Sequence, residues 1–292
     1  MQLNLHFYSK ILLKKGDILN NIGRLDDDDQ KIIDDKIDQI CESLKKKHHK
    51  KAEKILVEFS NTPNHFVREY LGKNLVFCEH QKELKKIAET MLKHKIYGIR
   101  ATALFYLVEL NKNKPENIFE IIKKVFDKVP WESEIIINEM WRRFPQIAKE
   151  KMLLWAESEH ENMRALSFHG MENIATEDTD FVMKFITKVI DDESVAVQKK
   201  ISHILTQVLR ANPIVVFPYI YEWLEDADDQ RIKTIWVAMK KLANIVAQRK
   251  ERGQEVELVM LTEQTIKDWK NDDNKKVSKM GGKLFRIIQT KR

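Results

Sequence analysis

Basic side chains recur along this chain at one position of a repeated helical pattern. In each copy a polar break is followed by an apolar residue, a basic residue and then apolar residues at helical spacing. Arg68 and Arg100 lie 32 residues apart, and Arg164 follows after a further 64, which is two periods of the pattern. Weaker copies bring further cations to the same part of the pattern: Lys199, Lys200 and Lys233.

Two interpretations of these cations are open. Equivalent positions of successive repeats line one surface, and a row of cations there suits a phosphate backbone, which accepts about half or more of protein–DNA hydrogen bonds. Alternatively, each arginine pairs with an acid of the next repeat and has a structural role. The lysine and histidine run at residues 45–51 is similarly either a solvated helix end or a patch that contacts phosphates.

Motifs of metal, nucleotide and nucleophilic chemistry are missing from the sequence. It has no glycine-rich phosphate loop, no HExxH or CxxC motif and no nucleophile elbow. The nine histidines are scattered without ligand spacing, and the two cysteines, Cys41 and Cys78, form no metal pattern. We therefore expect no metal and no cofactor.

The repeated pattern also predicts the elements that position the cations. A helical period of about 30 to 45 residues is typical of a solenoid, in which each helix pair buries its apolar face against its neighbours. We predict an all-α, right-handed superhelical solenoid of HEAT-like antiparallel helix pairs with a basic concave face. The copy missing after Arg100 should fall near Glu134 and Ile135, within a helix that begins at Trp131.

Composition and organisation agree with a helical fold. The chain of 292 residues has only 8 glycines and 6 prolines, too few for the turns of a strand-rich fold of this length. We expect one domain over residues 1–292. Within it, we expect capping helices over 1–50, HEAT-like repeats over 51–245 and a C-terminal capping repeat over 246–292.

Charge and hydropathy bear on partners and location. The net charge of +6 permits an anionic partner without requiring one. The first residues have lysines inside a weakly apolar stretch, which does not fit a signal peptide, and no apolar run approaches the ~20 residues of a membrane span. We expect a cytoplasmic monomer that does not associate with membranes.

Four segments carry a resemblance to a known family. The segments are 94–110, which contains Gly-Ile-Arg100-Ala-Thr-Ala; 129–132, which reads Val-Pro-Trp131-Glu132; 154–167; and 197–213. In this order and spacing they resemble the HEAT-like alkylpurine DNA glycosylases, the DNA alkylation repair family, over about residues 60 to 245.

The resemblance implies a function as well as a fold. In this family the concave face is expected to hold a DNA duplex, from which cationic N3- or N7-alkylpurines are excised without base flipping. The glycosidic bond of such a base is weakened by its positive charge. A carboxylate near the deoxyribose can stabilise the oxocarbenium-like charge and orient water, and tryptophan faces can hold the cationic base.

The family's catalytic positions transfer to this sequence only in part. Trp131 matches the family's tryptophan, and Glu132 matches the acid directly after it. The catalytic acid is expected four residues after the tryptophan, where this chain has Ile135. Glu134 is the nearest substitute, about 100° away around the helix. Alternatively, Trp131 packs at the helix start and both acids only favour the helix dipole.

The resemblance also implies residues that contact DNA. Arg164 matches the basic residue expected at the backbone near the lesion, and Arg142 could extend the basic face. His203 stands where one branch of the family has a second tryptophan, and Gln207 stands near the position of another branch's aspartate. We therefore count Arg142, Arg164 and His203 with the repeated cations as candidate DNA contacts.

Two functions of different classes follow. The first is a double-stranded DNA-binding alkylation-repair protein, a glycosylase of alkylated DNA with an altered acid. The second is a non-catalytic HEAT-type scaffold that binds a protein or unmodified nucleic acid. A reachable carboxylate beside Trp131 would favour the first, whereas Ile135 with no reachable acid would favour the second.

Overall fold

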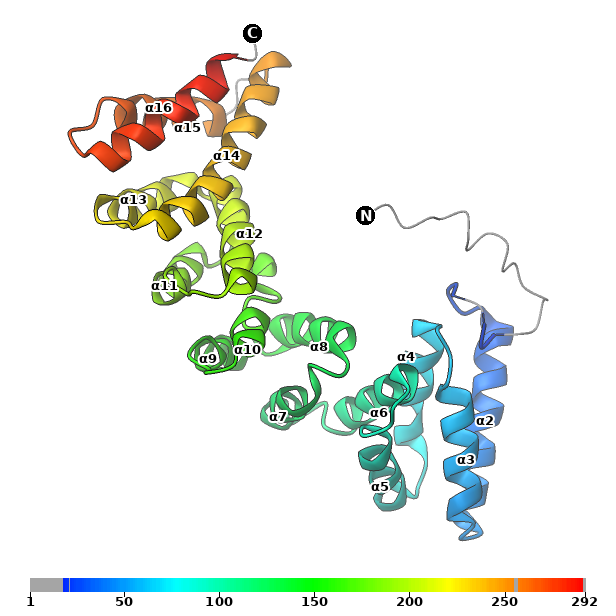
Figure 1. The fold of residues 1–292 in the computed structure, drawn as a ribbon. Coiled ribbons are helices and arrows are strands. Elements are labelled where there is room, and N and C mark those ends of the chain that lie inside the picture. The colour runs from blue at the N-terminus through cyan, green and yellow to red at the C-terminus, as the bar shows by residue number, and fades with distance from the viewer. Residues whose placement is uncertain (1–17, 21, 255–256, 291–292) are drawn as a thin grey trace. The chain divides into compact units, whose positions relative to one another are not determined.

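The computed structural model describes residues 18–20, 22–254 and 257–290 of the chain (Figure 1). Within these ranges every regular element is helical and no strand occurs. The prediction of an all-α fold is therefore confirmed. None of the described helices combines the length and the hydropathy that a membrane span needs.

The chain divides into two compact units, Met1–Ile135 and Ile136–Arg292. The boundary falls inside a single helix, α8 (Pro130–Arg143). The single domain, its capping segments, the right-handed superhelix and its concave basic face stay predictions.

Two layers of helices make up the first unit. Helices α2, α4 and α6 contact one another in turn, and α3 and α5 lie in a second layer beside them. α7 follows and contacts α6. The helices are α2 (Asp27–Lys45), α3 (His49–Ser60), α4 (His65–Asn74), η1 (Leu75–Phe77), α5 (Gln81–Met91), α6 (Tyr97–Leu110) and α7 (Pro115–Val125).

Helix α6 is the most deeply buried helix of this unit, since it contacts α3, α4, α5 and α7. Nearly all its residues from Gly98 to Val108 are buried, as expected of a helix with no solvent face. Gly72 on α4 permits a close approach, because a Cβ there would lie 2.7 Å from the Cβ of Phe105. This packing fixes the starts of α4 and α6 beside each other.

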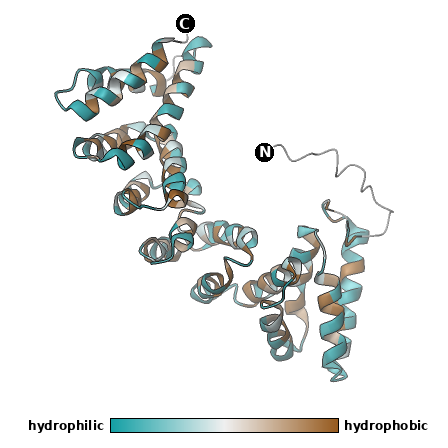
Figure 2. Ribbon diagram, in the orientation of Figure 1, coloured by the Kyte–Doolittle hydropathy of each residue, from teal (hydrophilic) through white to brown (hydrophobic). Residues whose placement is uncertain are grey.

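Stacked helix pairs also build the second unit. Helices α10, α12, α14 and α16 contact one another in turn, and α9, α11, α13 and α15 do so in a second layer. Hydrophobic residues occur along both layers (Figure 2). The elements are α9 (Pro145–Ala156), α10 (Glu161–Leu166), η2 (Met171–Asn173), α11 (Thr179–Val189), α12 (Val195–Ala211), α13 (Pro213–Glu225), α14 (Asp229–Glu251), α15 (Glu257–Lys270) and α16 (Lys275–Thr290).

Local sequence signals explain where helices begin. The side chain of Asn64 accepts a hydrogen bond from the backbone N–H of Phe66 at 2.9 Å and so caps α4. Pro130 is the first residue of α8, a position where the missing N–H has no helical partner to lose. α8 thus begins one residue earlier than predicted, and Trp131 is its second residue.

Candidate functional site at the start of helix α8

Trp131 is 62% exposed, which is uncommon for so large an aromatic side chain. The centroid of its ring lies 6.1 Å from that of the His65 imidazole on α4. An exposed indole face can hold a flat cationic group by a cation–π contact. The placement of Trp131 at a helix start agrees with the sequence analysis, and its role stays a prediction.

Glu132, the next residue, is turned into the interior and is 0% exposed. Its carboxylate accepts a hydrogen bond from Arg68 Nη2 at 2.9 Å and another from the Tyr97 hydroxyl. Burial alone would raise the pKa of Glu132, but His65, Tyr97 and the charge of Arg68 outweigh burial and hold that pKa below its ordinary value. The prediction that Glu132 is catalytic is therefore corrected: no DNA sugar can reach a carboxylate that is fully enclosed and paired.

His65 links this buried carboxylate to a second one. Its Nδ1 lies 3.8 Å from Glu132 Oε1, and its Nε2 lies 3.4 Å from Glu69 Oε2. The contacts with Glu132 and then Glu69 raise the pKa of His65 to about 9 despite partial burial. The contact with His65, together with Lys73, lowers the pKa of Glu69 to about 2. Both groups are therefore charged at neutral pH.

Glu134 is the remaining carboxylate close to Trp131 along α8. It is partly exposed, as is Ile135, which occupies the position where the resemblance places the catalytic acid. Residues three and four apart are neighbours on a helix surface, so Glu134 and Ile135 flank the position of Trp131. Trp131 and Glu134 are thus accessible on α8, while Glu132 is enclosed.

Three of the predicted cations hold the turn that precedes their own helix. Arg68, Arg100 and Arg164 are the fourth residues of α4, α6 and α10. Each Nη1 donates to the backbone carbonyls six and five residues earlier, at 2.7 to 3.0 Å. In α12 the fourth residue is Gln198, and its side-chain amide donates to the two equivalent carbonyls. The side chain at this repeated position thus has a structural role. We call Arg68, Arg100 and Arg164 braces, because each holds the turn before its helix.

The same arginines also donate hydrogen bonds to residues that follow them in the sequence. Arg164 donates to both carboxylate oxygens of Asp192, at 2.6 and 3.1 Å, and Arg68 donates to Glu132. Arg100 donates to a backbone carbonyl in the turn before α8. Arg68 is only 4% exposed, so the prediction that it contacts phosphates is wrong. Arg100 and Arg164 are partly exposed, and their contact with DNA stays a prediction.

Exposed cations in the second unit lie elsewhere on the helices. Lys199 of α12 and Lys233 of α14 are exposed, and so is Arg142 near the end of α8. None of them occupies the fourth position of its helix. They remain candidate DNA contacts, although they do not continue the arginine series.

Two further candidate DNA contacts, Lys200 and His203, have partners within the protein. Lys200 Nζ lies 2.8 Å from Nε2 of His169, and burial, helped by Lys200, lowers the pKa of His169 to about 4. The neutral imidazole therefore accepts a hydrogen bond from the ammonium. His203 is exposed, and its Nε2 lies 3.3 Å from Glu172 Oε1.

The residues that contact Glu132, directly or through His65, were not predicted from the sequence. His65, Glu69 and Tyr97 come from α4 and α6, far from Glu132 in the sequence, and no spacing within one helix joins them. Pairing with an acid of the next repeat was one of the two interpretations of these arginines. Arg164 makes such a pair with Asp192, whereas the acid partner of Arg68, Glu132, lies two repeats further along the chain.

Comparison with known proteins places the chain in a family. A family model described as DNA alkylation repair enzyme matches residues 45–242, more than half of the chain. The chain belongs to the DNA alkylation repair enzyme family. The matched segment contains Trp131, Glu134 and the three arginine braces, whereas α15 and α16 lie beyond it.

Other comparisons are more distant. No curated protein matches this family member. Among solved structures, an engineered protein is 10% identical with a TM-score of 0.32, covering 87% of this chain and 68% of its own. A second engineered protein is 12% identical, with a TM-score of 0.26 and coverage of 87% and 97%. A designed armadillo repeat protein is 13% identical, with a TM-score of 0.23 and coverage of 86% and 99%.

Proposed function

We propose that this DNA alkylation repair family member binds alkylated duplex DNA and hydrolyses the N-glycosidic bond of cationic N3- or N7-alkylpurines. The observation that carries the proposal is the exposed indole of Trp131 at the start of α8. A cationic purine is flat and charged, and tryptophan is the best side-chain partner for such a group.

The buried contacts below Trp131 support a rigid site. Arg68 and Tyr97 bind Glu132, and Glu132 is the residue that follows the tryptophan. These contacts tie the first turn of α8 to α4 and α6, so the backbone that carries Trp131 is fixed before DNA binds. A site fixed in advance loses less free energy on binding.

The proposed reaction needs one reachable carboxylate. The bond between C1′ of the deoxyribose and the purine nitrogen breaks, and its electron pair leaves with the base, which becomes neutral. Water adds to C1′ and loses a proton. Glu134 is the carboxylate that we propose to stabilise the charge on the sugar and to accept this proton. Its partial exposure and its position three residues after Trp131 support this role.

Release of the base from methylated duplex DNA tests the proposal. We expect slow release of 3-methyladenine or 7-methylguanine, and a decrease of about 10²-fold or more with Glu134→Gln. A matched control is Glu139→Gln on the same helix, since Glu139 pairs with Arg143 at 3.1 Å. Release that survives Glu134→Gln unchanged would exclude Glu134 as the acid.

A non-catalytic scaffold is the second candidate, favoured by two observations. Ile135 occupies the position of the expected acid, and the three repeated arginines donate to protein carbonyls, two of them also to carboxylates. A scaffold for DNA would bind unmodified duplex with a strong salt dependence and release no base. Absence of duplex binding at low salt would exclude DNA as the partner.

We also propose that the protein is a cytoplasmic monomer.

A further inference from the structure

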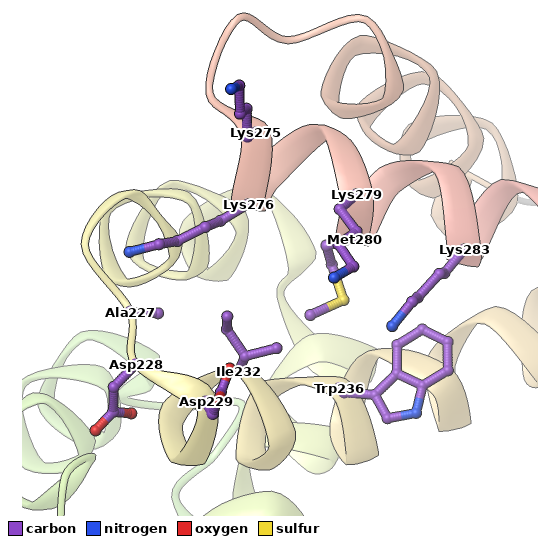
Figure 3. Close-up of a pocket in the computed structure, with 10 residues that line it drawn as sticks. All are labelled: Ala227, Asp228, Asp229, Ile232, Trp236, Lys275, Lys276, Lys279, Met280 and Lys283. Atoms are coloured by element: carbon purple, nitrogen blue, oxygen red, sulfur yellow. The ribbon is translucent and has the colours of Figure 1, made fainter.

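A cleft of about 630 Å³ opens in the second unit between the start of α14 and one side of α16 (Figure 3). Its volume is typical of ligand sites, which measure about 300 to 1,000 Å³. Apolar groups of Ile232, Trp236 and Met280 contribute to its lining. Lysines of α16 line the other side: Lys275, Lys276, Lys279 and Lys283.

Three of these lysines direct their ammonium groups into the cleft. Figure 3 shows Lys276 extended toward the loop before α14, and Lys279 and Lys283 extended toward the helix itself, whereas Lys275 points away. Lys279 and Lys283 are one helical turn apart, about 6 Å along the axis. The Lys283 ammonium lies 5.5 Å from the centroid of the Trp236 ring, so a cation–π contact holds it there.

None of these three lysines makes a direct ion pair within the described part of the protein. Among the residues that the structure describes, no ion pair joins Lys276, Lys279 or Lys283 to a carboxylate. Two acids also line the cleft, Asp228 and Asp229. Asp228 caps α14 by accepting a hydrogen bond from the backbone N–H of Arg231 at 2.7 Å, and Asp229 is exposed. Three neighbouring cations repel one another, and a bound anion would relieve that repulsion.

The position of the cleft relates it to other exposed cations of the same unit. α16 is the last helix of the layer formed by α10, α12 and α14. The exposed Lys199 and Lys233 belong to α12 and α14 of this layer. The family match ends at residue 242, before α16 begins at Lys275, so the match assigns no role to this helix.

We propose that this cleft binds successive phosphate groups of a DNA duplex. Lysines placed a turn apart present point charges along a line, which suits a backbone with regularly spaced phosphates and carries no base specificity. The cleft would extend the DNA-binding surface beyond the segment that defines the family. This inference rests on the proposed DNA binding, and it does not depend on base release.

The test compares the salt dependence of duplex binding for two triple variants of the full chain. The first replaces Lys276, Lys279 and Lys283 with glutamine. The control replaces three exposed lysines with glutamine on helices outside the layer that contains α16, namely α3, α7 and α15. These lysines are Lys54, Lys123 and Lys267. Fluorescence anisotropy with a labelled duplex gives the slope of log K against log salt. We expect the cleft variant to have a slope shallower by about 2 to 3, since each phosphate contact contributes about 0.9.

The control variant should retain the wild-type slope, and circular dichroism should show that both variants stay folded. Duplex DNA should also protect the three cleft lysines of the wild type from acetylation, as measured by mass spectrometry. If the wild type binds DNA but the cleft variant keeps its slope, the cleft proposal is wrong and the proposed function stands. If the wild type binds no DNA at low salt, both are wrong. A loss seen only with single strands would overturn the duplex assignment.

Discussion

Cationic side chains serve opposite purposes in two regions of this molecule. Around Glu132, the guanidinium of Arg68 is enclosed and its Nη atoms donate to two backbone carbonyls and one carboxylate. In the cleft beside α16, three lysines have no carboxylate partner among the residues described. The planar fork of arginine suits several fixed acceptors at once, whereas lysine is a hydrated point charge. Arginine therefore holds the repeats together here, and lysine remains available to an anion.

The largest effect is expected from breaking the enclosed pair. Arg68→Met removes the closer cation and leaves the buried carboxylate of Glu132 with His65 as its remaining charged partner, which costs about 3 kcal/mol or more of folding free energy. Urea unfolding followed by circular dichroism measures the loss. Lys279→Met is the matched change in the cleft, and it should alter stability by no more than about 0.5 kcal/mol. Equal losses in both variants would contradict the contrast between the two regions.

Removing a partly exposed brace should have the next largest effect. Arg164→Met loses two bonds to carbonyls and the ion pair with Asp192, and we expect a loss of about 1.5 to 3 kcal/mol of stability. Anisotropy with a labelled duplex, under conditions in which the variant is folded, tests the predicted DNA contact of Arg164 separately. Unchanged stability would contradict the structural role, and unchanged affinity would take Arg164 off the DNA-contact surface.

A smaller effect is expected from pH, because the contact of His65 with Glu132 and Glu69 requires a charged imidazole. The pKa of His65 is raised from 6.5 to about 9 in the fold. Its contribution to stability is therefore complete below pH 6.5 and is lost as the pH rises through 9. We expect about 1 to 2 kcal/mol, since solvent screens part of the interaction. Urea unfolding between pH 6 and about 9.5 measures the loss, and His65→Gln should remove this dependence.

The smallest effect is expected from replacing Trp131, a change that should weaken DNA binding without altering the stability of the fold. Trp131→Ala should change stability by no more than about 0.5 kcal/mol, because the side chain is exposed. Affinity for duplex DNA with a cationic alkylpurine should fall by about 0.5 to 1 kcal/mol, roughly two- to fivefold, with no change for unmodified duplex. Anisotropy on matched duplexes measures both values. Equal losses on both duplexes would assign Trp131 a general role in DNA contact.

The spacing of residues predicted the helical repeats, but it did not predict which groups the repeated arginine side chains contact. The common place of Arg68, Arg100 and Arg164 was visible as a period, and each is the fourth residue of its helix. Whether such an arginine faces DNA or its own turn depends on backbone carbonyls, which every residue has and no sequence pattern marks. Both interpretations were therefore open until the hydrogen bonds were known.

The site around Trp131 was predictable only in part for a similar reason. The resemblance located Trp131 near the start of a helix, and the structure agrees to within one residue. The enclosure of Glu132 was hidden, because it results from Tyr97 and His65 on other helices. The cations of the α16 cleft were hidden as well, since Trp236 and Lys283 are brought together only by the packing of α14 against α16.

The rate of base release from methylated duplex DNA, with the protein in excess, tests the proposed glycosylase activity most directly. We expect release of 3-methyladenine or 7-methylguanine above the spontaneous rate, lost with Glu134→Gln and retained with Glu139→Gln. A wild-type rate equal to spontaneous depurination, under conditions in which the duplex is bound, would contradict it and leave a scaffold that binds DNA without chemistry.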